Sequence, residues 1–142
     1  MNRWCGLTTC AWLLSATLVS VACTKSDTQS SVIPGTTTGE GLAIEFRSES
    51  NPPTSGDNTF DVTVRRGGAP VTDATVTAAF SMPAMPSMNM PEMHGTATLA
   101  PQGDGRYRGT GRLSMAGTWN VVITVSIGTE ELGSHRLSIV AK

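Results

Sequence analysis

The sequence predicts an all-β domain, an immunoglobulin-like antiparallel β-sandwich of about seven strands. Apolar residues alternate with polar ones in short runs, and turn-forming residues separate these runs. No segment repeats its apolar residues with the period of a helix. Several short strands between Gly41 and Lys142, within the usual size of one domain, are typical of a β-sandwich.

Each expected strand carries apolar residues at every second position, as a half-buried strand does. In chain order these residues are Leu42, Ile44 and Phe46; Phe60, Val62 and Val64; Val76, Ala78 and Phe80; Ala97 and Leu99; Tyr107; Trp119, Val121, Ile123 and Val125; and Leu137 and Ile139. The turns between them are expected at Asn51–Asp57, Gly67 and Gly68, Pro101–Gly105, and Gly128. Trp119 is the expected centre of the core, because tryptophan supplies much apolar area to a small domain. His135 is expected on the surface of the last strand.

The N-terminus has the features of an export signal, assigned to residues 1–22. A short basic start precedes a largely apolar run from Leu7 to Ala22, which is too short for a membrane-spanning helix of about 20 apolar residues. The run ends beside Cys23 in a pattern similar to a bacterial lipobox, which predicts lipidation of Cys23. Ser20 and Ala22 also fit an ordinary cleavage site, and cleavage there would release a free secreted protein.

The residues after the signal predict an anchored domain without disulfides. Cys5 and Cys10 lie inside the signal, so Cys23 is the only cysteine of the expected mature chain. Residues 23–40 are rich in serine, threonine and glycine, and we expect a flexible tether. The expected protein is therefore anchored by lipid in the cell envelope, with the domain at 41–142 facing the periplasm or the cell exterior.

Composition argues against two function classes. The net charge is −1 and the chain has no basic stripe, so nothing favours nucleic-acid binding. The only histidines are His94 and His135, and no arrangement typical of a catalytic triad, paired carboxylates or a phosphate loop is found. We therefore do not expect an enzyme.

The most informative segment runs from Met82 to His94. It contains five of the seven methionines, and prolines 83, 86 and 91 exclude a continuous helix. Thioether sulfur is an uncharged, polarizable ligand that suits Cu(I), and it carries no proton that would compete with the metal. The segment thus predicts a Cu(I) site, whose candidate ligands are Met82, Met85, Met88, Met90, Met93 and His94.

The spacing of the candidate ligands along the chain favours some of them and leaves alternatives open. Met85, Met88, Met90 and Met93 form the expected ligand core, because long side chains near one another on an extended chain can converge. His94 is either a fifth donor or a solvent-facing residue at the start of the next strand. A different interpretation is that the methionines form an apolar loop that packs on the domain or docks on a partner.

Four motifs together resemble one protein family. They are Phe80-Ser81-Met82-Pro83-Ala84-Met85, Met90-Pro91-Glu92-Met93, the run from Leu99 to Tyr107, and Met115-Ala116-Gly117-Thr118-Trp119. In this order they resemble the YtkA-like domain, which is related to the FixH proteins, over residues 42–140. The resemblance implies an immunoglobulin-like sandwich in the cell envelope. It also implies copper handling, with a copper chaperone, a respiratory oxidase or a metal-efflux protein as partner.

Two differences bear on this resemblance. FixH-type proteins usually carry a transmembrane helix, whereas this chain has an expected signal and lipid anchor. Its methionine segment is richer than the short Met-Pro-x-Met pattern and is similar in composition to the loops of CopC-type copper proteins. Two hypotheses follow: a copper-binding lipoprotein that buffers or delivers Cu(I), or a metal-free interaction module that docks on a membrane complex.

Overall fold

The computed structural model describes residues 32–142. This part of the chain contains nine strands and one short 3-10 helix: β1 (Thr36–Thr38), β2 (Leu42–Ser48), β3 (Gly56–Arg66), β4 (Ala69–Pro70), β5 (Thr75–Met82), η1 (Pro86–Met88), β6 (Met93–Gly103), β7 (Arg106–Leu113), β8 (Gly117–Ile127) and β9 (Glu130–Ala141). None of its helices has the length and apolar character needed to cross a membrane.

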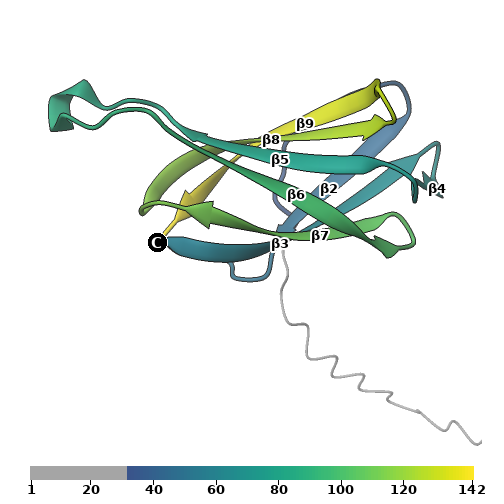
Figure 1. The fold of residues 1–142 in the computed structure, drawn as a ribbon, viewed down its shortest axis with the longest axis horizontal. Helices are drawn as coiled ribbons and strands as arrows, with labels where there is room; N and C mark the ends of the chain where they lie inside the picture. The colour runs from purple at the N-terminus through teal and green to yellow at the C-terminus, as the bar shows by residue number, and fades with distance from the viewer. Residues whose placement is uncertain (1–31) are drawn as a thin grey trace, which may run out of the picture.

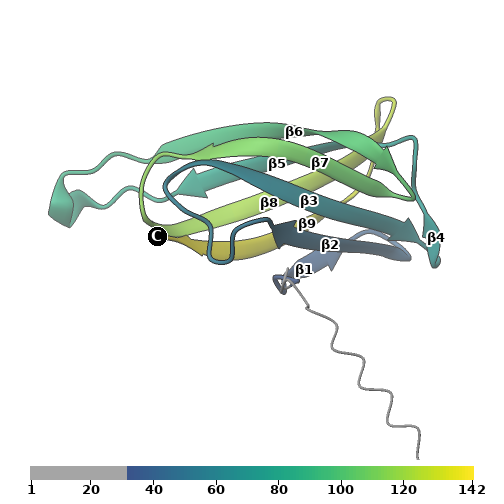
Figure 2. The same cartoon turned by 90° about the horizontal axis from the view of Figure 1, so that it is seen from below.

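The strands form an antiparallel, nearly closed sandwich in the order β1-β9-β8-β5-β6-β7-β3-β2, with β4 beside β3. Strand β6 belongs to both layers, because it pairs with β5 from Met93 to Leu99 and with β7 from Ala100 to Gly103. Figures 1 and 2 show the strands wrapped around a common interior, with the β5–β6 hairpin reaching beyond one end. The predicted fold class is confirmed, and β2, β3 and β5 to β9 are the seven predicted strands.

Alternation along the strands builds the core. Trp119, Phe46 and Phe60 are fully buried, and Phe80 is nearly so. The ring of Phe60 lies 5.2 Å from that of Phe46 and 5.1 Å from that of Phe80, centroid to centroid. The indole N–H of Trp119 donates a hydrogen bond to the carbonyl of Met115 at 3.1 Å, so its one polar atom is satisfied. Trp119 is the central core residue that the sequence predicts.

The N-terminal segment differs from the expected tether where the structure describes it. Residues Thr36–Thr38 form β1 against β9, and the amide of Ile33 donates to the carbonyl of Phe46 at 3.0 Å. The segment is rich in threonine and poor in apolar residues, a composition that predicts a linker. The β-branched side chain of threonine also favours strands. Strand pairing in the described residues therefore begins before Gly41. The signal and Cys23 lie outside the described residues.

His135 is buried, so its predicted surface position is wrong. It faces inward on β9 with 4% of its surface exposed. Its Nδ1 is hydrogen-bonded to the hydroxyl of Thr37 in β1 at 2.7 Å, and its Nε2 is buried without a partner. Burial disfavours the charged imidazolium and lowers the pKa of His135. The sequence could not show this, because β1 covers the side chain and β1 was not predicted.

Candidate functional site

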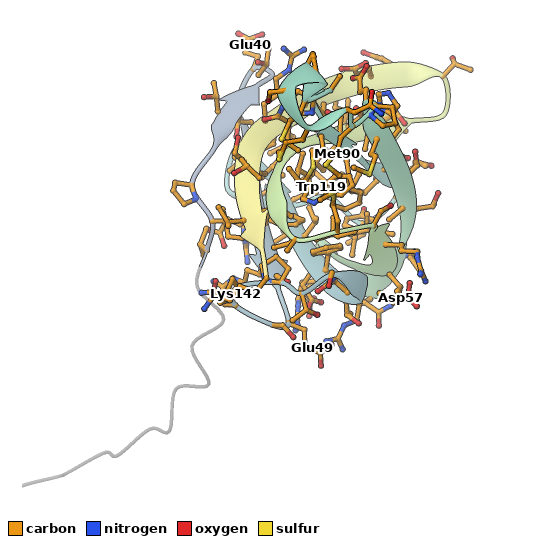
Figure 3. The ribbon with its side chains drawn as sticks, turned by 90° about the vertical axis from the view of Figure 1, so that its left-hand side faces the viewer. Glu40, Glu49, Asp57, Met90, Trp119 and Lys142 are labelled. Atoms are coloured by element: carbon orange, nitrogen blue, oxygen red, sulfur yellow. The ribbon has the colours of Figure 1, made fainter. Side chains whose placement is uncertain are left out.

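The methionine segment forms the end of the β5–β6 hairpin. We call residues 82–93 the hairpin arm. Figure 1 shows it projecting from the body of the sandwich, and Figure 3 looks onto this end, where Met90 is labelled. The regular ladder of β5 and β6 ends at the pair Met82 and Met93, and the arm continues to the turn η1. All five clustered methionines therefore lie at one end of the molecule.

Antiparallel pairing places the methionines opposite one another. Met82 is the partner of Met93 in the β5–β6 register, and Met85 forms an isolated bridge with Met90. The amide of Met85 donates to the carbonyl of Met90 at 2.9 Å, and the reverse bond measures 3.2 Å. Side chains directly opposite on paired strands have Cβ atoms about 4.5–5.5 Å apart. Flexible thioethers at that separation can meet on one ion.

The tip is closed by local backbone chemistry. Pro86 begins η1, where its fixed φ is compatible with a helical turn. The amide of Met88 donates to the carbonyl of Met85 at 3.0 Å, and the amide of Asn89 donates to the carbonyl of Pro86 at 3.1 Å. Asn89 then reverses the chain in the left-handed conformation, with φ 54°, which asparagine tolerates better than most residues. Met88 thus lies in the turn that joins Met85 to Met90.

Burial differs among the five methionines. Met82 is only 2% exposed and belongs to the core, and Met93 is half-buried against that core. Met85 is half-buried and, like Met93, packs against the core. Met90 is also half-buried, whereas Met88 is 59% exposed. We call Met85, Met88 and Met90 the tip group, and the cross-strand pair Met82 and Met93 the basal pair. The tip group therefore lies at the end of the arm, on the Met85–Met90 bridge and the turn between them, and Met82 lies inside the domain.

An apolar pocket lies where the arm joins the sandwich. Its volume is about 260 Å³, and it is lined by Met82, Pro83, Met85, Gly117 and Thr118. The methyl group of Met82 packs so close to Gly117 that a Cβ there would lie 2.9 Å from it. Gly117 and Thr118 are not among the site residues that the sequence predicts. The sequence feature that could have identified them is the Met-Ala-Gly-Thr-Trp motif, to which both belong. The glycine of this motif leaves room for Met82 from another strand.

His94 lies apart from the thioethers. Its side chain is 68% exposed, and its Nε2 is 3.5 Å from a carboxylate oxygen of Glu92. Met93 and His94 are successive residues of β6, and successive side chains of a strand point to opposite faces. Since Met93 faces the core, the imidazole faces solvent. This placement favours the solvent-facing alternative over a shared ion with Met93.

The donor atoms of the tip group are sulfur atoms, and the arm also carries side-chain oxygen atoms on Ser87, Asn89 and Glu92. Residues 82–91 include no charged side chain. Across residues 32–142, no group of three or more histidine, cysteine, aspartate or glutamate side chains is placed to hold a metal ion. Hard cations prefer oxygen ligands, so the tip group matches the preferences of a soft ion.

The sequence was compared with known protein families, and one family matches a range that includes the hairpin arm. The family model described as YtkA-like matches residues 36–124, more than half of the chain. The matched range begins at β1 and contains the hairpin arm, Gly117 and Trp119. No curated protein and no solved structure matches the chain. The extent of the family match, from the first strand through both sides of the arm to β8, shows that this chain belongs to the YtkA-like family.

Proposed function

We propose that this protein binds Cu(I) at the tip of the hairpin arm through Met85, Met88 and Met90, with Met93 as a further candidate donor. The observation that carries the proposal is the fold-back of the arm, which sets Met85 against Met90 and places Met88 on the turn between them. Three neutral thioethers suit a soft monovalent ion. Met82 is excluded from this set by its burial in the core.

The position of the tip suits exchange of the ion with a partner. The arm projects from the sandwich (Figure 1), and Met88 is the most exposed of its methionines. An incoming ligand can therefore replace Met88 before it replaces the half-buried Met85 and Met90. We propose buffering or delivery of Cu(I) in the cell envelope, with lipid on Cys23 as the anchor. A copper chaperone, a respiratory oxidase or an efflux-system protein is the proposed partner.

A competition titration tests the metal site. Residues 24–142 contain the whole described domain and no cysteine, so a thiol cannot contribute to binding. Cu(I) is titrated against a chromophoric chelator with this chain and with a variant in which Met85, Met88, Met90 and Met93 are leucine. We expect stoichiometric binding that the leucine variant loses. Met115→Leu is the matched control, because Met115 lies outside the arm, and it should bind as the parent does.

The second candidate function is metal-free docking on a membrane complex. The uncharged stretch 82–91 and the exposed Met88 favour it, because an exposed apolar tip suits an interface. Leucine keeps the apolar surface but removes sulfur, so the same variant separates the two functions. If the tip binds Cu(I), cells that produce the leucine variant should grow less well under copper stress than cells that produce the parent protein. A variant that supports growth fully would favour docking.

A further inference from the structure

The three thioethers of the tip group differ in their access to solvent, and this difference has a chemical consequence. Met88 is 59% exposed, while Met85 and Met90 are half-buried. A thioether is oxidised to the sulfoxide where an oxidant can reach its sulfur. The small polar oxidants of an aqueous compartment reach Met88 first.

The tip is built so that modification of Met88 leaves its backbone in place. The bonds that close it join main-chain atoms: Met85 to Met90 in both directions, and the amide of Met88 to the carbonyl of Met85. The exposed side chain of Met88 is not among the buried residues of the core. A polar sulfoxide at this position therefore stays in water and needs no buried partner.

We propose that Met88 is a redox-controlled ligand, at which peroxide switches off the Cu(I) site. This inference rests on the proposed function. In the reaction the O–O bond of hydrogen peroxide breaks, one oxygen forms the S=O bond, and water leaves. The sulfur loses two electrons and the peroxide gains them. The tip group then keeps two thioethers, and the oxygen of the sulfoxide is a harder donor that suits Cu(I) less well. Reduction of the sulfoxide restores the third thioether.

The experiment measures the site of oxidation and the affinity on the same sample. Residues 24–142 are treated with hydrogen peroxide until each chain carries about one added oxygen, and peptide mass spectrometry locates it. We expect Met88 to be oxidised before Met85, Met90, Met93 and Met82. Competition for Cu(I) should then weaken by about tenfold or more, because even groups behind metal ligands contribute roughly 10–100-fold to affinity.

Two leucine variants serve as controls. Met88→Leu should bind Cu(I) weakly from the start and show no further loss after mild peroxide treatment. Met115→Leu keeps the whole tip group and should lose affinity as the parent does. Treatment with a methionine sulfoxide reductase should recover binding in the parent and in Met115→Leu.

Each other outcome overturns the inference in a distinguishable way. Equal oxidation rates at Met85, Met88 and Met90 would show that solvent access does not select Met88. Unchanged Cu(I) affinity after oxidation of Met88 would show that its sulfur is not a ligand, while the site itself stands. Failure of the untreated protein to compete for Cu(I) would reject the proposed function and this inference with it.

Discussion

Met82 and Met88 are the same residue type in one hairpin arm, yet their surroundings give them opposite roles. Met82 fills the core beside Gly117, and Met88 stands in solvent at the tip. Residue type therefore identified the methionines as a group, while the function of each depends on what covers it. The same holds for the two histidines, since His94 is exposed and His135 is buried.

The contrast between the methionines predicts opposite effects of alanine substitution. Met82→Ala should lower the free energy of unfolding by roughly 2–5 kcal/mol, because it leaves a cavity in the core. Met88→Ala should change it by no more than about 0.5 kcal/mol, as is usual at exposed positions. Urea unfolding measures both. Equal destabilisation by the two substitutions would contradict the division into tip group and basal pair.

The burial of His135 predicts a pH dependence of stability. Because its pKa is lowered from 6.5 in the folded protein, the unfolded chain binds more protons as the pH falls below that value. The contribution of His135 to stability is therefore complete above pH 6.5 and declines as the pH falls towards the folded pKa. Urea unfolding between about pH 7 and pH 5 should show this decline.

Matched histidine variants identify the group responsible. His135→Gln removes the titrating imidazole, so its stability should depend less on pH over the same interval. His94→Gln changes an exposed side chain and should retain the slope of the parent. The assignment fails if the parent and His135→Gln have the same slope.

At the scale of elements, the hairpin arm depends on one residue with a positive φ. Asn89 adopts the left-handed conformation, which costs most residues with a Cβ about 1 kcal/mol or more. Asn89→Ala should therefore open the tip more often, whereas Asn89→Gly should not, because glycine accepts positive φ freely. Hydrogen exchange of the Met88 and Met90 amides measures this opening. Faster exchange in the glycine variant than in the alanine variant would contradict the prediction.

The arm also shows which part of the site was predictable. Its methionines and prolines are visible in the sequence, and they predicted an irregular segment with candidate metal ligands. Their spacing suggested Met85, Met88, Met90 and Met93 as one set. The structure pairs Met85 with Met90 and Met82 with Met93, because pairing across the hairpin, and not distance along the chain, decides which residues lie opposite one another.

At the scale of the whole molecule, β1 completes the domain. It covers His135 at the edge of the sheet, and Ile33 packs against the core just before it. A chain that begins at Gly41 lacks both contacts. We expect it to be less stable than one that begins at Val32 by about 1 kcal/mol or more, because full burial of an aliphatic side chain contributes about 1.5–3 kcal/mol and Ile33 is half-buried. Denaturant unfolding compares the two, and equal stabilities would show that β1 is dispensable.

The sequence alone determined the fold class and the seven main strands, because alternation with period two is a local pattern that records which face of a strand is buried. It also determined that thioethers are the donors concentrated in the arm. Only the tertiary structure decided that Met85 opposes Met90, that Met82 and His135 are buried, and that Thr36–Thr38 join the sheet. These facts depend on contacts between residues distant in the chain, and burial is set by the neighbouring strand that covers a side chain.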